Sequence, residues 1–206
     1  MQINDETFIT QKTFRALLQA MSHPGRVYQL EQKTEVRSQI TDKYNLFSVL
    51  QTLLDHEVGF CVIGKEKEYL KSNISELTGC PVKDISDADF IIVSDGESNG
   101  EILKAKKGSL EYPDTGATVI YSIRSLSQIP PYPPLVKGGI RGDLKLTLKG
   151  PGINGEISLF LVGVSKKEFH YLKEINSEYP LGIDSVFIDS ANRIMCIPRS
   201  TRIEVR

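Results

Sequence analysis

Apolar residues recur at helical spacing in several segments of the chain. Near the N-terminus they stand at offsets of 0, 3, 4 and 7, which is one face of an α-helix: Phe14, Leu17, Leu18 and Met21. This spacing predicts a helix over 10–21 that ends at the turn Ser22-His23-Pro24-Gly25. Similar spacing predicts helices over 44–54, 65–78 and 166–176, and a weaker pattern predicts one over 97–107.

Short runs of apolar and β-branched residues predict strands. The run at 90–93 is apolar throughout, which is typical of a central strand buried on both faces. Further strands are predicted over 27–30, 60–63, 117–123, 144–148, 186–188 and 195–197, and 156–162 is a strand or an extended segment. The last two strands should form a hairpin. Strands interleaved with helices early and a hairpin late indicate an α/β fold around a mixed sheet.

The chain has no long linker between two periodic regions, so we expect one domain over 1–206. The segment at about 128–141 contains Pro-Pro-Tyr-Pro-Pro and Lys-Gly-Gly. Such clusters of proline and glycine exclude regular structure, so this segment predicts an exposed loop.

Composition narrows the class of protein. The chain carries 25 basic and 26 acidic residues, a formal net charge of −1, which favours neither nucleic acid nor an anionic membrane surface as a partner. The first residues lack the basic start and apolar run of a signal peptide, and no run of about 18 apolar residues occurs. We therefore expect a cytoplasmic protein.

Cysteines and histidines do not form a recognised metal, disulfide or redox pattern. The 3 cysteines are odd in number and far apart, and Cys61 and Cys196 lie in predicted apolar strands, so we expect them in the core. The 3 histidines are equally scattered, and no bound metal is expected.

The sequence Gly150-Pro-Gly-Ile-Asn-Gly155 satisfies the GxGxxG pattern of dinucleotide-binding proteins. That pattern must open a helix whose N-terminal amides face the pyrophosphate, whereas 156–162 reads as extended. Pro151 also removes one backbone donor. A structural turn is therefore favoured over a phosphate cradle. No GxxxxGK[ST] sequence occurs, so a P-loop is absent.

Two histidines have possible chemical roles beside plainer ones. His56 stands between Asp55 and Glu57, which would favour its charged form for acid–base chemistry, but a position at a helix end explains it more simply. His23 lies in a rigid turn that could grip a ligand or partner, and the plainer interpretation is a helix stop.

Asp184, Arg199 and Arg202 are the other polar residues considered. Asp184 closely precedes a predicted strand and is either a functional acid or an acceptor in a turn, with the turn favoured. Arg199 and Arg202 could bind phosphate in a bidentate manner, although surface ion pairing is the commoner role of such residues. Taken alone, these residues predict no reaction.

Five stretches, in this order along the chain, carry a resemblance to a known family: FRALLQAMSHPG (14–25), Ala117-Thr118, LKGPGI (148–153), YPLGID (179–184) and IPR (197–199). Together they resemble the H subunit of the bacterial carbon–phosphorus lyase system of phosphonate metabolism. The resemblance extends from Phe14 to Val205. It departs from the family in the insertion at about 128–141, and in Tyr179, where phenylalanine is common.

The resemblance implies a three-layer α/β/α fold with a mixed sheet, similar to the pyridoxal-phosphate transferase fold but without that cofactor. It implies a homodimer within a complex whose other members are the G, I, J and L subunits. That complex transfers the ribose triphosphate of ATP to an alkylphosphonate and releases adenine. The resemblance assigns no catalytic residue and no cofactor to this subunit.

Residues of the family strings in rigid or glycine-bearing turns are the candidates for contact with a partner or a ligand: His23, Pro24, Gly25, Arg26, Gly182, Asp184 and Arg199. Two alternative functions compete with the complex subunit. One is a free-standing transferase of the pyridoxal-phosphate type, based on fold analogy. The other is a nucleotide-binding oxidoreductase that uses the glycines of 150–155.

Overall fold

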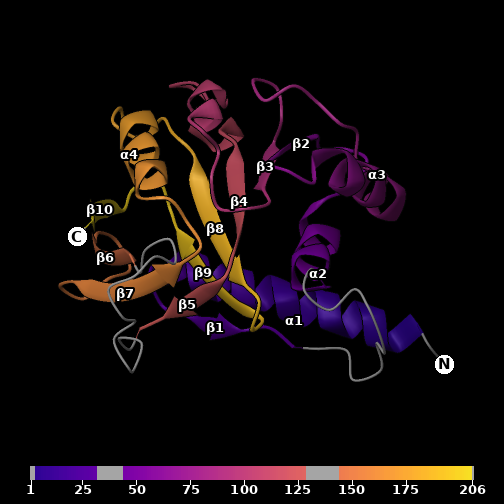
Figure 1. Ribbon diagram of the computed structural model, residues 1–206, viewed down its shortest axis with the longest axis horizontal. Coiled ribbons are helices and arrows are strands. Elements are labelled where there is room, and N and C mark those ends of the chain that lie inside the picture. The colour runs from indigo at the N-terminus through magenta and orange to yellow at the C-terminus, as the bar shows by residue number, and fades with distance from the viewer. Residues whose placement is uncertain (1–2, 32–43, 129–143, 206) are drawn as a thin grey trace.

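A computed structural model describes residues 3–31, 44–128 and 144–205. Two β-sheets and the helices around them form the structure (Figure 1). The larger sheet has six strands in the order β1-β9-β8-β4-β3-β2, and the smaller sheet has four in the order β10-β6-β7-β5. In the described part of the chain, no helix is both long enough and apolar enough to cross a membrane.

The six-stranded sheet is mixed, as the sequence predicts. Four neighbouring strands run parallel: β2 (Phe60–Ile63), β3 (Phe90–Val93), β4 (Thr118–Ile123) and β8 (Asp184–Asp189). The predicted hairpin is confirmed, because β9 (Arg193–Ile197) pairs antiparallel with β8. A short strand, β1 (Tyr28–Gln29), then pairs antiparallel with β9.

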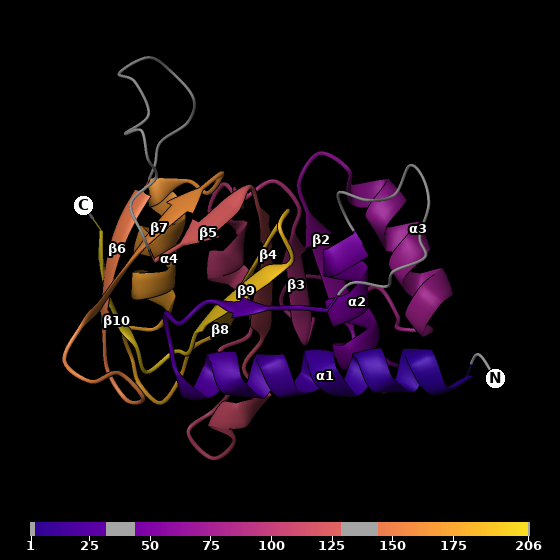
Figure 2. The same cartoon turned by 90° about the horizontal axis from the view of Figure 1, so that it is seen from below.

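Helices cover one face of this sheet: α1 (Ile3–Ser22), α2 (Tyr44–Leu53) and α3 (Lys67–Thr78) (Figure 2). Their apolar stripes pack on side chains that point to that face, which include Ile92, Ile120 and Val186. Side chains of a strand alternate between the two faces, so Phe187, next to Val186, points to the opposite face.

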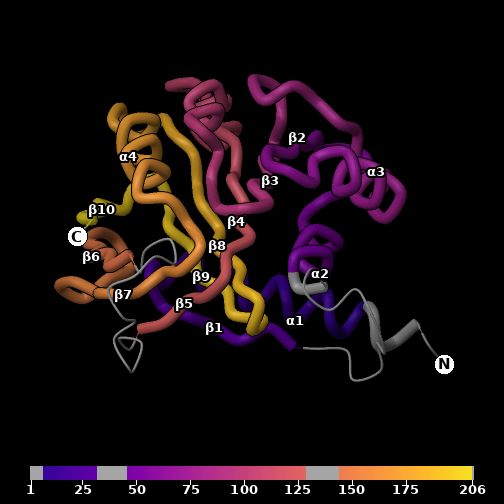
Figure 3. The backbone as a smooth tube through the Cα atoms, viewed as in Figure 1, coloured from indigo at the N-terminus to yellow at the C-terminus, as the bar shows by residue number. Residues whose placement is uncertain are grey.

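The second face is covered by the smaller sheet and by α4 (Lys166–Ile175). That sheet consists of β5 (Ser125–Ser127), β6 (Leu144–Lys149), β7 (Ile157–Val162) and β10 (Arg202–Val205). The chain passes from one sheet to the other at Arg124, directly between β4 and β5 (Figure 3). Tyr121, Phe187 and Phe169 stack at the centre of this second core.

Most predicted helices and strands are confirmed, but the helix expected over 97–107 is wrong. Only a 3-10 turn forms there, Glu101–Lys104, because Gly100 takes a left-handed φ of 85° before it and Ala105 is extended after it. The run at 90–93 is an interior strand next to the edge strand β2, while β8 and β4 occupy the middle. The predicted loop at 128–141 lies, except for Gln128, outside the described residues.

Candidate functional site

Four segments that carry the family strings are linked by contacts from one to the next, and we call them the loop cluster. They are the turn after α1 (22–26), the turn between β6 and β7 (150–153), the segment before β8 (180–184) and the loop after β9 (197–201). Because they come from distant parts of the sequence, only the fold brings them together. All seven candidate contact residues belong to this cluster.

Glycine allows the first two turns to approach closely. Gly152 has a φ of 78°, and a Cβ there would overlap the carbonyl oxygen of Ser22 and lie 2.9 Å from the Pro24 ring. Gly25 has a φ of 79°, and its Cβ would lie 2.7 Å from Ile157. The N–H of Gly25 also donates to the carbonyl of Cys196 over 3.3 Å, which ties the turn to the end of β9. Larger residues would separate these turns.

The GxGxxG segment is a turn, as favoured. It leads into the strand β7 rather than into a helix, so no helix N-terminus faces a phosphate there. Gly150 lies close to the loop after β9, where a Cβ would be 3.2 Å from the carbonyl of Ser200. Gly150 and Gly152 therefore serve the packing of the loop cluster, and the segment does not support the oxidoreductase alternative.

Asp184 and Arg199 form a bidentate ion pair. Arg199 Nη2 donates to Asp184 Oδ2 over 2.6 Å, and Nε lies 3.2 Å from both carboxylate oxygens. The Arg199 backbone N–H donates to Oδ1 over 2.8 Å, so the interpretation of Asp184 as an acceptor for a turn is confirmed. Ion pairing is likewise the observed role of Arg199, whose guanidinium also donates to the carbonyl of Pro113. Neither side chain is left free for acid chemistry or phosphate binding.

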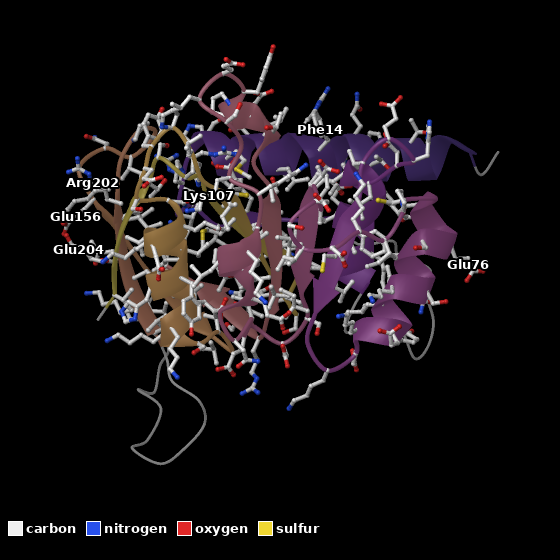
Figure 4. The ribbon with its side chains drawn as sticks, turned by 90° about the horizontal axis from the view of Figure 1, so that it is seen from above. Phe14, Glu76, Lys107, Glu156, Arg202 and Glu204 are labelled. Carbon is white, nitrogen blue, oxygen red and sulfur yellow. The ribbon has the colours of Figure 1, made fainter. Side chains whose placement is uncertain are left out.

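Gly182 extends this part of the cluster to the segment that precedes β4. Its N–H donates to the carbonyl of Lys107 over 3.0 Å, and its own carbonyl lies so close to Gly116 that a Cβ there would overlap it. Figure 4 shows Lys107 on the same side of the molecule as the exposed Phe14 of α1. Gly182, Asp184 and Arg199 therefore lie together in one part of the loop cluster.

Solvent exposure divides the candidate residues further. Pro24, Gly25 and Gly182 are buried, so they shape the cluster from within. His23 is half-buried, with Nδ1 3.1 Å from the carbonyl of Gln19, and Arg26 is exposed. The side chains of these two residues therefore reach the surface of the cluster. His56 is exposed in the turn that follows α2, which agrees with the plainer interpretation of that residue.

Glu168 is a buried carboxylate that the sequence did not reveal. It lies in the first turn of α4 and is 0 % exposed. It accepts bonds from the Ser98 N–H (2.8 Å), the Ser98 hydroxyl (2.7 Å) and the Tyr121 hydroxyl (2.9 Å). Burial raises the pKa of Glu168, because desolvation outweighs these donors. The S-x-x-E spacing of Ser165 and Glu168 is a capping-box signal, which predicts an exposed helix start rather than this network.

Outside the loop cluster, the carboxylate of Asp89 is bound by two lysines and a backbone N–H. Asp89 accepts from Gly59 N–H over 2.7 Å, from Lys83 over 3.4 Å and from Lys106. Burial opposes its ionisation, but the bonds from Lys106 and Gly59 prevail and lower the pKa of Asp89. Within 3–31, 44–128 and 144–205, no group of three or more His, Cys, Asp or Glu residues is placed to hold a metal ion.

Comparison with known proteins identifies the family to which this architecture belongs. A model of the bacterial phosphonate metabolism protein family (PhnH) matches residues 2–204. The chain belongs to this family. It is also similar to a putative C-P lyase subunit protein, HtxG, of Stutzerimonas stutzeri, with 29% identity over 198 residues, which are 95% of this chain and 86% of that protein. The resemblance seen in the sequence strings is thereby confirmed at the level of the family.

Proposed function

We propose that the chain is a subunit of a carbon–phosphorus lyase system that acts in phosphonate catabolism. The family match over residues 2–204 carries this proposal, and the name of the relative HtxG supports it. In the proposed reaction, the chain acts with the G, I and L subunits. Together they transfer the ribose triphosphate of ATP to an alkylphosphonate and release adenine, with the J subunit as a further member of the complex.

The proposed role of this subunit is to shape the complex rather than to react. General acid–base or electrostatic catalysis needs groups that are free to meet the substrate. In the loop cluster, the carboxylate of Asp184 and the guanidinium of Arg199 are instead bound to each other. We expect the isolated chain to release no adenine from ATP. We also place the chain in the cytoplasm.

The proposal includes the three-layer α/β/α arrangement of the pyridoxal-phosphate transferases, without that cofactor in this subunit. Apolar clusters on both faces of the six-stranded sheet support such layers. It also includes a homodimer, and partner contacts at the loop cluster. Among the residues of that cluster, His23 and Arg26 offer side chains at the surface.

The test is adenine release from ATP and a phosphonate by the reconstituted complex, with and without this chain. We expect release only when the chain is present together with its partners. Activity of the chain alone, or full activity in its absence, would refute the proposal. His23→Ala and Arg26→Ala should lower the activity of the complex several-fold, whereas His170→Ala, which changes an exposed residue of α4, should not.

A further inference from the structure

The strand β10 forms one edge of the four-stranded sheet. It pairs with β6 on one side, and no other strand of the described chain lies beside it (Figure 2). An edge strand turns unpaired backbone N–H and C=O groups outward, where a further strand can add to the sheet. Side chains of β10 alternate regularly, because Ile203 is buried while Arg202 and Glu204 are exposed.

The charges on this edge are unbalanced within one molecule. Arg202 lies directly opposite Lys149 of β6, and like charges at directly opposite positions disfavour pairing. Lys149 forms ion pairs with two glutamates, since its ammonium lies 3.2 Å from Glu156 and 3.7 Å from Glu204. Arg202 has no carboxylate partner in the described part of the chain. Figure 4 shows Arg202, Glu156 and Glu204 together at one end of the molecule.

We propose that β10 pairs antiparallel with β10 of a second copy, about a two-fold axis at Ile203. This surface rests on the homodimer of the proposed function and specifies where the two copies meet. With the axis at Ile203, Arg202 of each copy stands opposite Glu204 of the other. The two sheets then join into one, and both Arg202 side chains gain an acidic partner.

Charge selects this register over its neighbours. The apolar faces of the two sheets stay continuous only when the axis passes through a residue of β10 rather than between two residues. An axis at Arg202 would place arginine opposite arginine, and an axis at Glu204 would place glutamate opposite glutamate. Of these three axes, only the one at Ile203 places opposite charges together, twice by symmetry.

The first experiment reverses these charges and measures the dissociation constant of the dimer by sedimentation equilibrium. Arg202→Glu and Glu204→Arg should each weaken dimerisation by about tenfold or more, because each creates two like-charge pairs. The double variant R202E/E204R should restore it. Arg202→Glu places a carboxylate opposite Lys149, so unfolding does not explain a loss of dimer. Glu76→Arg, on α3 at the other end of the molecule, is the control (Figure 4).

A second experiment tests the register by cysteine cross-linking. Residues opposite each other in an antiparallel pair have Cα atoms about 4.5–5.5 Å apart, which a disulfide can bridge. A mixture of the R202C and E204C variants should therefore form a covalent dimer under mild oxidation, whereas each variant alone should not. The native cysteines are buried and do not compete.

The outcomes separate this surface from the function proposed above. A dimer that neither charge reversal weakens, or a chain that stays monomeric at high concentration, would overturn the β10 surface. The proposed function would still be tested separately, by adenine release from the reconstituted complex. If the reconstituted complex released no adenine while the chain formed a dimer that charge reversal weakens, the proposed function would be refuted and the β10 surface would be supported.

Discussion

Gly152 and Gly25 illustrate how single residues hold the loop cluster together. Each has a positive φ, and a Cβ at Gly152 would overlap the carbonyl of Ser22, while one at Gly25 would crowd the side chains of Ile157 and Leu148 in β7 and β6. A side chain would meet both a strained backbone and a steric overlap. The strings that carry the family resemblance thus include positions where only hydrogen fits. At these positions the family pattern reflects packing of turns rather than chemistry.

The ion pair of Asp184 and Arg199 is the charged counterpart of that packing. Its side chains are only 24% and 13% exposed, so removing one partner leaves a poorly solvated charge. We expect Asp184→Ala to lower the free energy of unfolding by about 1–3 kcal/mol, a value reduced for partial exposure. Urea denaturation measures this change. Glu76→Ala, at an exposed site, should change stability by less than about 0.5 kcal/mol. Equal effects of the two variants would show that the pair does not stabilise the fold.

At the scale of elements, Glu168 fastens the start of α4 to the segment after β3. Ser98 donates to it, and the N–H of Ser165 donates to the carbonyl of Gly96. A buried carboxylate whose folded-state pKa is raised binds its proton more tightly in the folded than in the unfolded chain. Its ionisation therefore costs stability, and that cost increases as pH rises above the unfolded pKa.

Glu168→Gln tests this linkage, because glutamine has similar size and does not ionise. We expect the free energy of unfolding of the native chain, relative to that of the variant, to fall as pH rises from about 4.5 towards neutrality. Urea denaturation of both proteins across this range measures the difference. A difference independent of pH would indicate an unshifted carboxyl, and one that rises with pH would indicate that the three donors prevail over burial.

Helices and buried strands could be predicted because their apolar periodicity is long or uninterrupted. The four-residue runs at 60–63 and 90–93 match β2 and β3 in both bounds. β5 and β10 were missed, since Ser125–Ser127 and Arg202–Val205 are short and largely polar, and only pairing with β7 and β6 makes them strands. The smaller sheet was therefore not predicted as a separate layer.

The seven candidate residues were found through family strings, but the contact of Asp184 with Arg199 depends on the register of β8 and β9.

At the scale of the whole molecule, the segment at 128–141 is expected to be dispensable. Loop length changes closure entropy only slowly. Gln128 itself donates to the carbonyl of Gly25 over 3.3 Å and should be kept. Replacing 129–141 by a short Gly/Ser turn should shift the melting temperature by less than about 2 °C, measured by calorimetry. A loss of several degrees would contradict this and assign the segment a packing role.

Pyridoxal phosphate binding is the last prediction, and it concerns the fold as a whole. A Schiff base needs an unprotonated lysine, and a neighbouring carboxylate favours the charged form of lysine instead. Lys83 and Lys106 are held in ion pairs with Asp89, and the neighbouring Glu156 and Glu204 raise the pKa of Lys149. We therefore expect titration with pyridoxal phosphate to give no saturable Schiff-base absorbance. Saturable absorbance that a single Lys→Ala variant abolishes would instead support a free-standing transferase, because this fold would then carry the cofactor itself.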